Sequence, residues 1–258
     1  MQRRLVTFLA VGLLTVGGSS AIAATFTGTD GADNFTGTAL PDQFFGEAGD
    51  DVLTGLAGND YLEAGPGDDR VDAGSGLDLV IGGTGDDYIV GGSSADVVYA
   101  GVGNDEVLGD AGDDAIFGQD GDDRLFGASG KDRIYLNTGI NFADGGSGAD
   151  RIYAEGGETH IVGGSGNDVL IASNGVFLVS GGAGKDRIRT GDEGDRVIGG
   201  PSADGIATGA GDDEVQARDG RRDRVHCGSG RDTVDADPFD ILRGCEIKGP
   251  TSLASRLR

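Results

Sequence analysis

The chain has 258 residues, of which 52 are glycine and none is tryptophan, and aromatic residues make up only 6%. This composition excludes a domain with one thick hydrophobic core and favours a repetitive architecture with a thin core renewed along its length. The formal net charge of −24 argues against nucleic acid as a partner and indicates that cations must neutralise the chain before it can fold.

Residues 1–23 have the features of a cleaved export signal. Arg3 and Arg4 precede an apolar run from Leu5 to Val16, and small residues around Ala23 follow. This order is typical of a secretory signal and predicts a secreted, extracellular protein. The apolar run is short for a bilayer and no later run is longer, so no membrane span is expected. An uncleaved signal-anchor is the alternative.

From residue 33 to residue 213 the chain repeats every nine residues without an insertion. Twenty steps of nine give 21 phased positions, and 18 of these hold aspartate. The aspartates are Asp33, Asp42, Asp51, Asp60, Asp69, Asp78, Asp87, Asp96, Asp105, Asp114, Asp123, Asp132, Asp150, Asp168, Asp186, Asp195, Asp204 and Asp213. The residue two places after each phased position is apolar in every repeat. The residue two places before it is glycine except at Leu40, Ser94, Glu193 and Ser202.

Each repeat combines a turn with a short strand, as in the nonapeptide Gly82-Gly83-Thr84-Gly85-Asp86-Asp87-Tyr88-Ile89-Val90. Its glycines suit a tight turn, and its last residues, with one inward apolar side chain, suit a strand. Two repeats bring the chain around once, which stacks residues i and i+18 about 4.8 Å apart. The sequence therefore predicts an all-β fold, a parallel β-roll (β-solenoid) with 18-residue coils made of two nonapeptides.

Stacking would place the phased aspartates in two columns, one on each edge of the roll. Short strands and a thin core do not hold such a rod by themselves, and like charges at the spacing between coils repel. A hard dication between successive turns would reverse this repulsion, and turn carbonyls would complete an all-oxygen shell that suits Ca²⁺. Mg²⁺ is the alternative ion, disfavoured by its reluctance to lose water and its strict octahedral geometry.

The pattern Gly-Gly-x-Gly-x-Asp-x-apolar-x resembles the hemolysin-type, or RTX, calcium-binding repeat over about residues 28–243. The resemblance implies a parallel β-roll with Ca²⁺ between turns on both edges, where the third glycine and the aspartate of each repeat carry the ligands. It implies metal roles for all 18 phased aspartates. If every aspartate pair separated by 18 residues holds one ion, about 15 Ca²⁺ sites are expected.

Three phased positions lack aspartate, namely Asn141, Thr159 and Phe177, and they are 18 residues apart. They therefore fall on one edge, while the other edge continues unbroken. Because Gly139, Gly157 and Gly175 persist, we expect these turns to keep their shape without an ion. Two interpretations are open: a calcium-free strip with Phe177 and nearby Phe142 that binds a partner, or drift at turns that their neighbours stabilise.

The repeat changes step after residue 213, to ten at Asp223, nine at Asp232 and eight at Asp240, so we expect the roll to end there. Cys227 and Cys245 are 18 residues apart, which places them on adjacent coils and predicts a disulfide in an oxidising compartment. A metal site that includes His226 lacks enough ligands. We expect a β-roll domain over residues 24–245 and a basic tail over residues 246–258, either loose or a short docking segment.

These features predict a secreted calcium-binding β-roll, expected to be a monomer, whose folding is coupled to Ca²⁺. It would act as an extracellular structural or surface-interaction module. No enzymatic activity is expected, because neither a zinc-protease helix motif nor a Gly-x-Ser-x-Gly elbow is present. The alternative is a secreted hydrolase or polysaccharide-modifying protein with a carboxylate-based site on the roll. An ice-binding role is disfavoured, since the position after the glycine pair, for example Ala48 and Ala57, holds no threonine row.

Arginines occupy many positions directly after a phased aspartate. We interpret them as balancing surface charge and discouraging edge pairing, with binding of an acidic polysaccharide as the alternative. They are Arg70, Arg124, Arg133, Arg151, Arg187 and Arg196.

Overall fold

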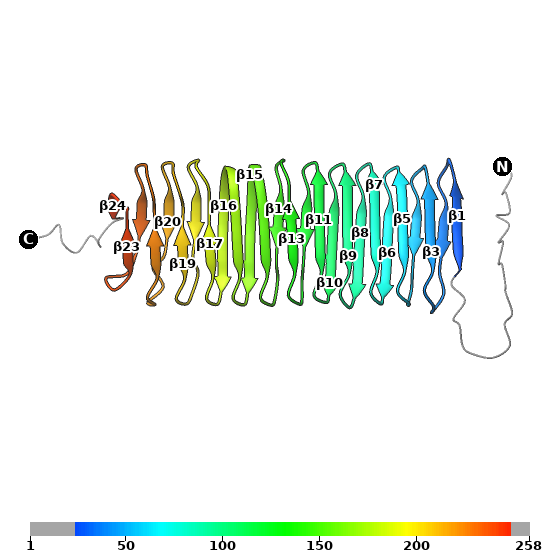
Figure 1. Ribbon diagram of the computed structural model, residues 1–258, viewed down its shortest axis with the longest axis horizontal. Helices are drawn as coiled ribbons and strands as arrows, with labels where there is room; N and C mark the ends of the chain where they lie inside the picture. Colours follow the sequence, from blue (N-terminus) through cyan, green and yellow to red (C-terminus); the bar gives the residue numbers. More distant parts are fainter. Residues whose placement is uncertain (1–23, 249–258) are drawn as a thin grey trace, which may run out of the picture.

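The computed structural model describes residues 24–248, which form a rod of about 12 stacked turns with strands running across its long axis (Figure 1). The coil has 18 residues and the described residues contain no helix, so the predicted parallel β-roll is confirmed. The predicted export signal, residues 1–23, and residues 249–258 of the predicted tail lie outside the described residues.

Strands on each face pair in parallel with the strands one coil before and one coil after. The first face contains β1 (Thr25–Thr29), β3 (Gln43–Glu47), β5 (Tyr61–Pro66), β7 (Leu79–Thr84), β9 (Val97–Val102), β11 (Ala115–Asp120), β13 (Arg133–Leu136), β17 (Arg187–Arg189), β19 (Gly205–Ala207), β21 (Arg224–His226) and β23 (Ile241–Arg243). The second face contains β2 (Asn34–Thr36), β4 (Val52–Thr54), β6 (Arg70–Ser75), β8 (Tyr88–Ser93), β10 (Glu106–Ala111), β12 (Arg124–Phe126), β14 (Phe142–Asp144), β18 (Arg196–Ile198), β20 (Glu214–Gln216), β22 (Thr233–Asp235) and β24 (Ile247–Lys248). Two longer strands, β15 (Arg151–Ser165) and β16 (Val169–Ala183), contribute to both faces.

The pairing register is 18 residues over most of the roll and changes near its C-terminal end. Thr25 pairs with Gln43 at the start, and Arg196 still pairs with Glu214. Gly205 then pairs with Arg224, a step of 19, because the turn before β21 holds one extra residue. The last pairing joins β22 to β24, so strand pairing extends past Cys245 into the segment expected to be tail.

The core lies between the two faces and is as thin as the sequence predicts. All 21 apolar residues two places after the phased positions are buried, and none is more than 5% exposed. A further inward row, at the first glycine position of the repeat, contributes Ala64, Ala73, Ala100 and Leu136. At the N-terminal end Phe26 stacks on Phe44, with ring centroids 4.7 Å apart, and partly covers the open core.

The turns depend on left-handed backbone that glycine adopts without strain. Gly148 has φ +144°, and a Cβ there would collide with the carbonyl oxygen of Gly130 on the preceding coil. Ser94 and Ser202 replace glycine at the corresponding position and keep positive φ values of 93° and 134°. The left-handed turn is therefore retained at these two departures from the repeat.

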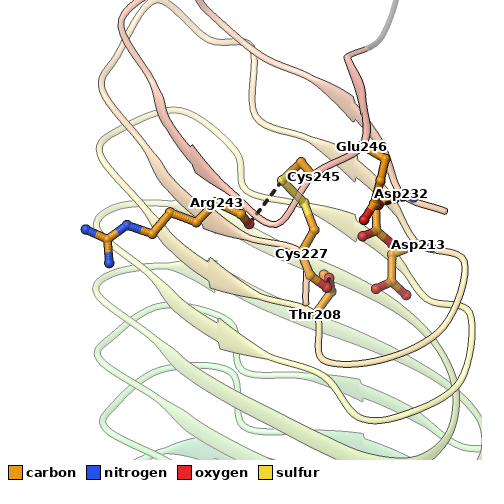
Figure 2. Close-up of a disulfide and its surroundings, with 7 residues drawn as sticks. All are labelled: Thr208, Asp213, Cys227, Asp232, Arg243, Cys245 and Glu246. Carbon is orange, nitrogen blue, oxygen red and sulfur yellow. Dashed lines mark hydrogen bonds between the residues drawn. A yellow bond between two sulfur atoms is a disulfide. The ribbon is translucent and has the colours of Figure 1, made fainter. Parts of the chain in front are cut away.

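Cys227 and Cys245 form a disulfide with Cα atoms 5.2 Å apart, which confirms the predicted bond (Figure 2). Cys227 is fully buried in the core, and the hydroxyl of Thr208, one coil earlier, donates a hydrogen bond to the carbonyl oxygen of Cys227. The bond therefore ties the last coil to the coil beneath it.

Replacing both cysteines by serine is expected to destabilise the C-terminal coils by about 3 kcal/mol, the entropy term for a closed loop of this length. Hydrogen exchange followed by mass spectrometry would detect faster exchange in residues 218–248. The coils before residue 200 should exchange as in the parent protein, and equal acceleration along the whole rod would contradict a local role.

Candidate metal centre

The phased aspartates stack into two columns, one along each edge of the roll. The backbone N–H of each phased aspartate donates a hydrogen bond to Oδ1 of the column residue one coil later, as from Asp114 to Asp132 at 2.9 Å and from Asp69 to Asp87 at 2.9 Å. The carboxylates are therefore fixed by the coil before them. Of the 18 predicted residues, 17 are buried, and Asp33 in the first coil is partly exposed.

In most of these aspartates, and in Asp223 and Asp232 near the C-terminal end, the second carboxylate oxygen is buried and has no hydrogen-bond partner within residues 24–248. These Oδ2 atoms belong to Asp51, Asp60, Asp69, Asp78, Asp87, Asp96, Asp105, Asp114, Asp123, Asp132, Asp150, Asp168, Asp186, Asp195, Asp204, Asp213, Asp223 and Asp232. A buried, ionised oxygen without a partner is costly, because it has lost its water and gained nothing in return. Rows of such atoms indicate that something outside the chain must satisfy them.

A backbone carbonyl oxygen lies beside these carboxylates. A Cβ placed on Gly145 would lie 2.6 Å from the carbonyl oxygen of Gly163 and 2.7 Å from Oδ2 of Asp150. A Cβ on Gly109 would similarly lie 3.0 Å from the oxygen of Gly127 and 2.5 Å from Oδ2 of Asp114. The missing side chain of glycine thus leaves a small space that a carboxylate oxygen and a carbonyl oxygen share.

Burial raises the pKa of the carboxyl groups along both columns. Loss of hydration is the largest cause, and it raises the pKa of Asp114 and Asp150 to about 7 and that of Asp78 to about 6. The backbone hydrogen bond from the preceding coil partly opposes the shift, and neighbouring carboxylates add to it. Without a cation, the folded roll therefore holds protons that the same groups release in water at neutral pH.

The donor atoms available suit a hard cation. Among residues 24–248 no three acidic, histidine or cysteine side chains cluster closely enough to hold a metal by themselves, so an ion would also need carbonyl oxygens. Carboxylate and carbonyl oxygens together form the shell that Ca²⁺ accepts in flexible geometry, whereas Mg²⁺ demands a strict octahedron. The residues present therefore fit calcium better than magnesium.

The strip without aspartate differs from the other turns. The side chain of Asn141 still accepts the column hydrogen bond, from the N–H of Asp123 at 2.7 Å. At Thr159 the column is interrupted, and its buried hydroxyl has no partner within the described residues. Phe177 turns inward, is 1% exposed and joins the hydrophobic core, so it does not offer a surface to a partner.

The expected preservation of these turns is wrong at two of the three. Gly139 keeps a positive φ of 152°, close to the usual third glycine. Around Thr159 and Phe177 the chain instead continues as strand through β15 and β16, so that Gly157 pairs with Gly175. Neither of these two positions holds a carboxylate, and strand pairing between adjacent coils takes the place of the glycine turn.

Replacing Phe177 by alanine is expected to lower the free energy of unfolding by about 3–5 kcal/mol, the usual cost of an emptied aromatic site in a core. Denaturant unfolding in saturating calcium would measure it. Phe177→Leu is the control, expected to cost less than about 1.5 kcal/mol because most of the volume is kept. A neutral Phe177→Ala substitution would show that the side chain does not support the strip.

Sequence reasoning missed members of both columns beyond residue 213. Asp223 continues one column by accepting from the N–H of Asp204 at 2.8 Å, and Asp232 continues the other by accepting from Asp213 at 3.2 Å. Both are fully buried. The signal was the same Asp-x-apolar pattern after one inserted residue, which a fixed period of nine does not follow.

A second, exposed row of oxygens was also missed. It lies at the position directly before the phased aspartate, where Oδ1 of Asp68, for example, accepts from the N–H of Asp86 at 2.9 Å. Its members include Asp50, Asn59, Asp68, Asp86, Asn104, Asp113, Asp122, Asn167 and Asp212. The frequent Asp or Asn at this position in the sequence was the available signal.

Comparison with known proteins agrees with this geometry. A search among curated proteins found no match to the chain. The sequence profile of the RTX calcium-binding nonapeptide repeat, which covers four copies at a time, matches residues 27–62, 45–80, 72–107, 99–134, 108–143, 126–160, 135–170, 156–176 and 180–215. Together these matches cover most of the roll. The chain therefore belongs to the family of proteins with RTX calcium-binding nonapeptide repeats.

Proposed function

We propose that this chain is an exported β-roll that folds when it binds Ca²⁺ and then serves as an extracellular structural or interaction module. The observation that carries the proposal is the double column of buried Oδ2 atoms without partners. Low calcium inside the cell leaves these carboxylates charged and repelling, which keeps the acidic chain open for export. Millimolar calcium outside stabilises the roll by binding only its folded form.

All 18 predicted aspartates are proposed as calcium ligands, together with Asp223 and Asp232. Asp33 is the weakest candidate, because it is partly exposed at the N-terminal end. Export and an extracellular location are proposed from residues 1–23 alone. Within residues 24–248, no helix is long and apolar enough to span a membrane.

A carboxylate-based hydrolase receives no support from the geometry. The carboxyl groups with raised pKa, such as Asp87 and Asp204, are at most 3% exposed. A general acid must reach within hydrogen-bond distance of its substrate, and a buried Oδ2 does not.

The test is a calcium titration of residues 24–258 followed by far-UV circular dichroism, with magnesium as the control. We expect a cooperative gain of β signal near about 1 mM Ca²⁺ and none with Mg²⁺. Calorimetry should count about 17 bound ions if each stacked aspartate pair holds one, including the pairs of Asp204 with Asp223 and of Asp213 with Asp232. A chain that is folded in chelator at neutral pH and unchanged by calcium would overturn the proposal.

A further inference from the structure

Charge is not spread evenly over this acidic rod. On the first face, the outward-facing strand positions from β13 to β23 carry arginine six times and an acidic residue only once, Glu155 in β15. The arginines are Arg133, Arg151, Arg187, Arg189, Arg224 and Arg243. The second face instead mixes signs, as in the ion pair of Arg196 with Glu214 at 3.7 Å. One face of the C-terminal half is therefore basic, although the chain as a whole is strongly negative.

A groove of about 640 Å³ lies within this basic face, across β17, β19 and β21. Arg187, Arg189 and Arg224 line it together with His226 and Arg243. Its volume falls within the range of small-molecule binding sites. In Figure 1 these strands lie toward the C-terminal end of the rod, and in Figure 2 the side chain of Arg243 extends outward from the coil, away from the disulfide.

Two small residues create the groove. Gly205 and Ala207 occupy the outward positions of β19, where β16, two coils earlier on this face, carries Val169 and Ile171. Both larger residues line the same groove. The coil at β19 is thus indented relative to its neighbours by loss of side-chain volume.

Backbone geometry does not require glycine at position 205. An added Cβ would meet only the carbonyl oxygen of Asp186, at an ordinary contact distance of 3.8 Å, and φ is not in the left-handed region. By contrast, at Gly209 in the following turn φ is +93° and a Cβ would collide with Gly191. Glycine inside a strand weakens it and often marks the close approach of a ligand. Gly205 is such a glycine, since it lies in a strand and its backbone does not require the absence of a side chain.

The arginines around the groove are free to bind an anion. Within residues 24–248 the guanidinium groups of Arg187, Arg189, Arg224 and Arg243 make no ion pair with an acidic side chain. Arginine binds carboxylate and sulfate groups through paired N–H donors. Val169 and Ile171 add apolar walls, which suit the C–H faces of a sugar ring.

We propose that this groove binds an acidic glycan, a saccharide chain that carries carboxylate or sulfate groups. An acidic glycan with one charge per sugar ring is less densely charged along its length than duplex DNA, which carries one charge per about 1.7 Å. Four arginines between two acidic edges suit the glycan, whose negative charges are more widely spaced than those of DNA. The proposal rests on the proposed function, since the groove exists only in the folded roll, and it assigns a ligand class to the interaction module.

The test compares variants of the full mature chain at fixed free calcium. Gly205→Val with Ala207→Ile fills the groove with the residues that β16 carries and keeps every charge. Arg189→Gln with Arg224→Gln removes two groove charges, and Arg70→Gln with Arg124→Gln removes two charges from the second face as the matched control. The probes are a galacturonate hexamer, a sulfated glucose hexamer, a neutral glucose hexamer and a single-stranded DNA oligonucleotide, each followed by fluorescence polarisation.

We expect at least one acidic hexamer to bind the parent and the second-face variant equally. Both groove variants should lose at least about tenfold in affinity, the arginine variant because charged hydrogen bonds are removed and the filled variant because its larger side chains exclude the ligand. The neutral hexamer should not bind. The two acidic probes show whether carboxylate or sulfate is preferred. Equal loss in the second-face variant, tighter binding of DNA than of glycan, or no binding of either acidic hexamer would overturn the proposal.

Circular dichroism is recorded for every variant with and without calcium. It distinguishes a failure of the glycan-binding proposal from a failure of the proposed calcium-coupled folding. A chain that folds on calcium but binds no acidic hexamer retains the proposed function and loses only the glycan site. A chain that binds the hexamer through the groove while folded in chelator retains the site and loses calcium-coupled folding.

Discussion

In chelator, the β-roll is expected to form near about pH 5 and to be lost as the pH rises to about 8. The carboxyl groups of both columns have folded pKa values raised above the ordinary value of 3.8 by burial, to about 7 at Asp96 and Asp204 and about 6 at Asp105. Acid would then replace calcium as the agent that neutralises the columns.

The sign follows from proton binding. A group whose pKa is raised on folding holds its proton in the roll but loses it in the unfolded chain between about pH 4 and 7. Its contribution to stability is fully present below about pH 3.8, the pKa of the group in the unfolded chain. This contribution is lost as the pH rises through the pKa of the group in the folded roll. One pKa unit corresponds to about 1.4 kcal/mol, and a whole domain is stable by only about 5–15 kcal/mol. Several such groups therefore decide whether the calcium-free chain folds.

Circular dichroism in chelator, scanned downward from about pH 8 to pH 5, would measure this transition. Sedimentation would check that the chain stays monomeric near its sequence pI of about 4.1. A parallel scan in about 1 M salt screens long-range repulsion, so a transition that persists there belongs to the buried columns. A chain unfolded at both ends of the scan, or folded at both, would contradict the prediction. In saturating calcium the dependence should reverse, because protons compete with the ion.

Asparagine in the middle of one column is expected to stabilise the calcium-free roll and to weaken the calcium-bound one. The substitutions are Asp96→Asn, Asp114→Asn and Asp132→Asn, made together. Asn141 shows that the fold accepts this residue, because its side-chain oxygen keeps the hydrogen bond from Asp123. The amide removes the buried negative charge but offers a calcium ion a weaker ligand.

Thermal unfolding of this triple variant should give a higher Tm than the parent in chelator at about pH 6, where the parent roll is still expected to form, and a lower Tm in saturating calcium. Calorimetry should count fewer bound ions. A surface triple, Asp72→Asn with Glu106→Gln and Asp120→Asn, removes the same three charges from exposed positions and should leave the ion count unchanged. A buried triple that lowers Tm under both conditions would show that the carboxylates support the roll without calcium.

The period of nine and its apolar position were sufficient to predict most of the fold. Each of these 21 apolar side chains is buried, and the aspartate columns form as expected, because both patterns depend only on strand alternation and on stacking at 18 residues. The disulfide followed from the same spacing. Strand alternation and the spacing of 18 residues were sufficient to predict the structure wherever a coil has the same pattern as its neighbours.

Prediction failed where a coil differs from its neighbours. The interpretation of the aspartate-free strip as a partner-binding surface required an exposed Phe177, but without a carboxylate to anchor the turn this side chain packs inward and β16 continues through it. Asp223 and Asp232 were left out because one inserted residue shifted their phase, although the strands re-register by 19. The basic groove depends on Gly205 and Ala207 facing outward between larger neighbours, a relation across coils that no single repeat contains.

The pairing of each strand only with its counterparts one coil away has a mechanical consequence. If the two ends of the rod are pulled apart along its axis, the hydrogen bonds of one coil carry the load without help from distant coils, so the coils peel away one after another from an end. Each released coil of 18 residues would lengthen the chain by about 60 Å at full extension, except the coil that the disulfide between Cys227 and Cys245 closes. Attached between a cell and its surroundings, such a rod would yield in equal steps and could wind up again once the tension is released and calcium is present.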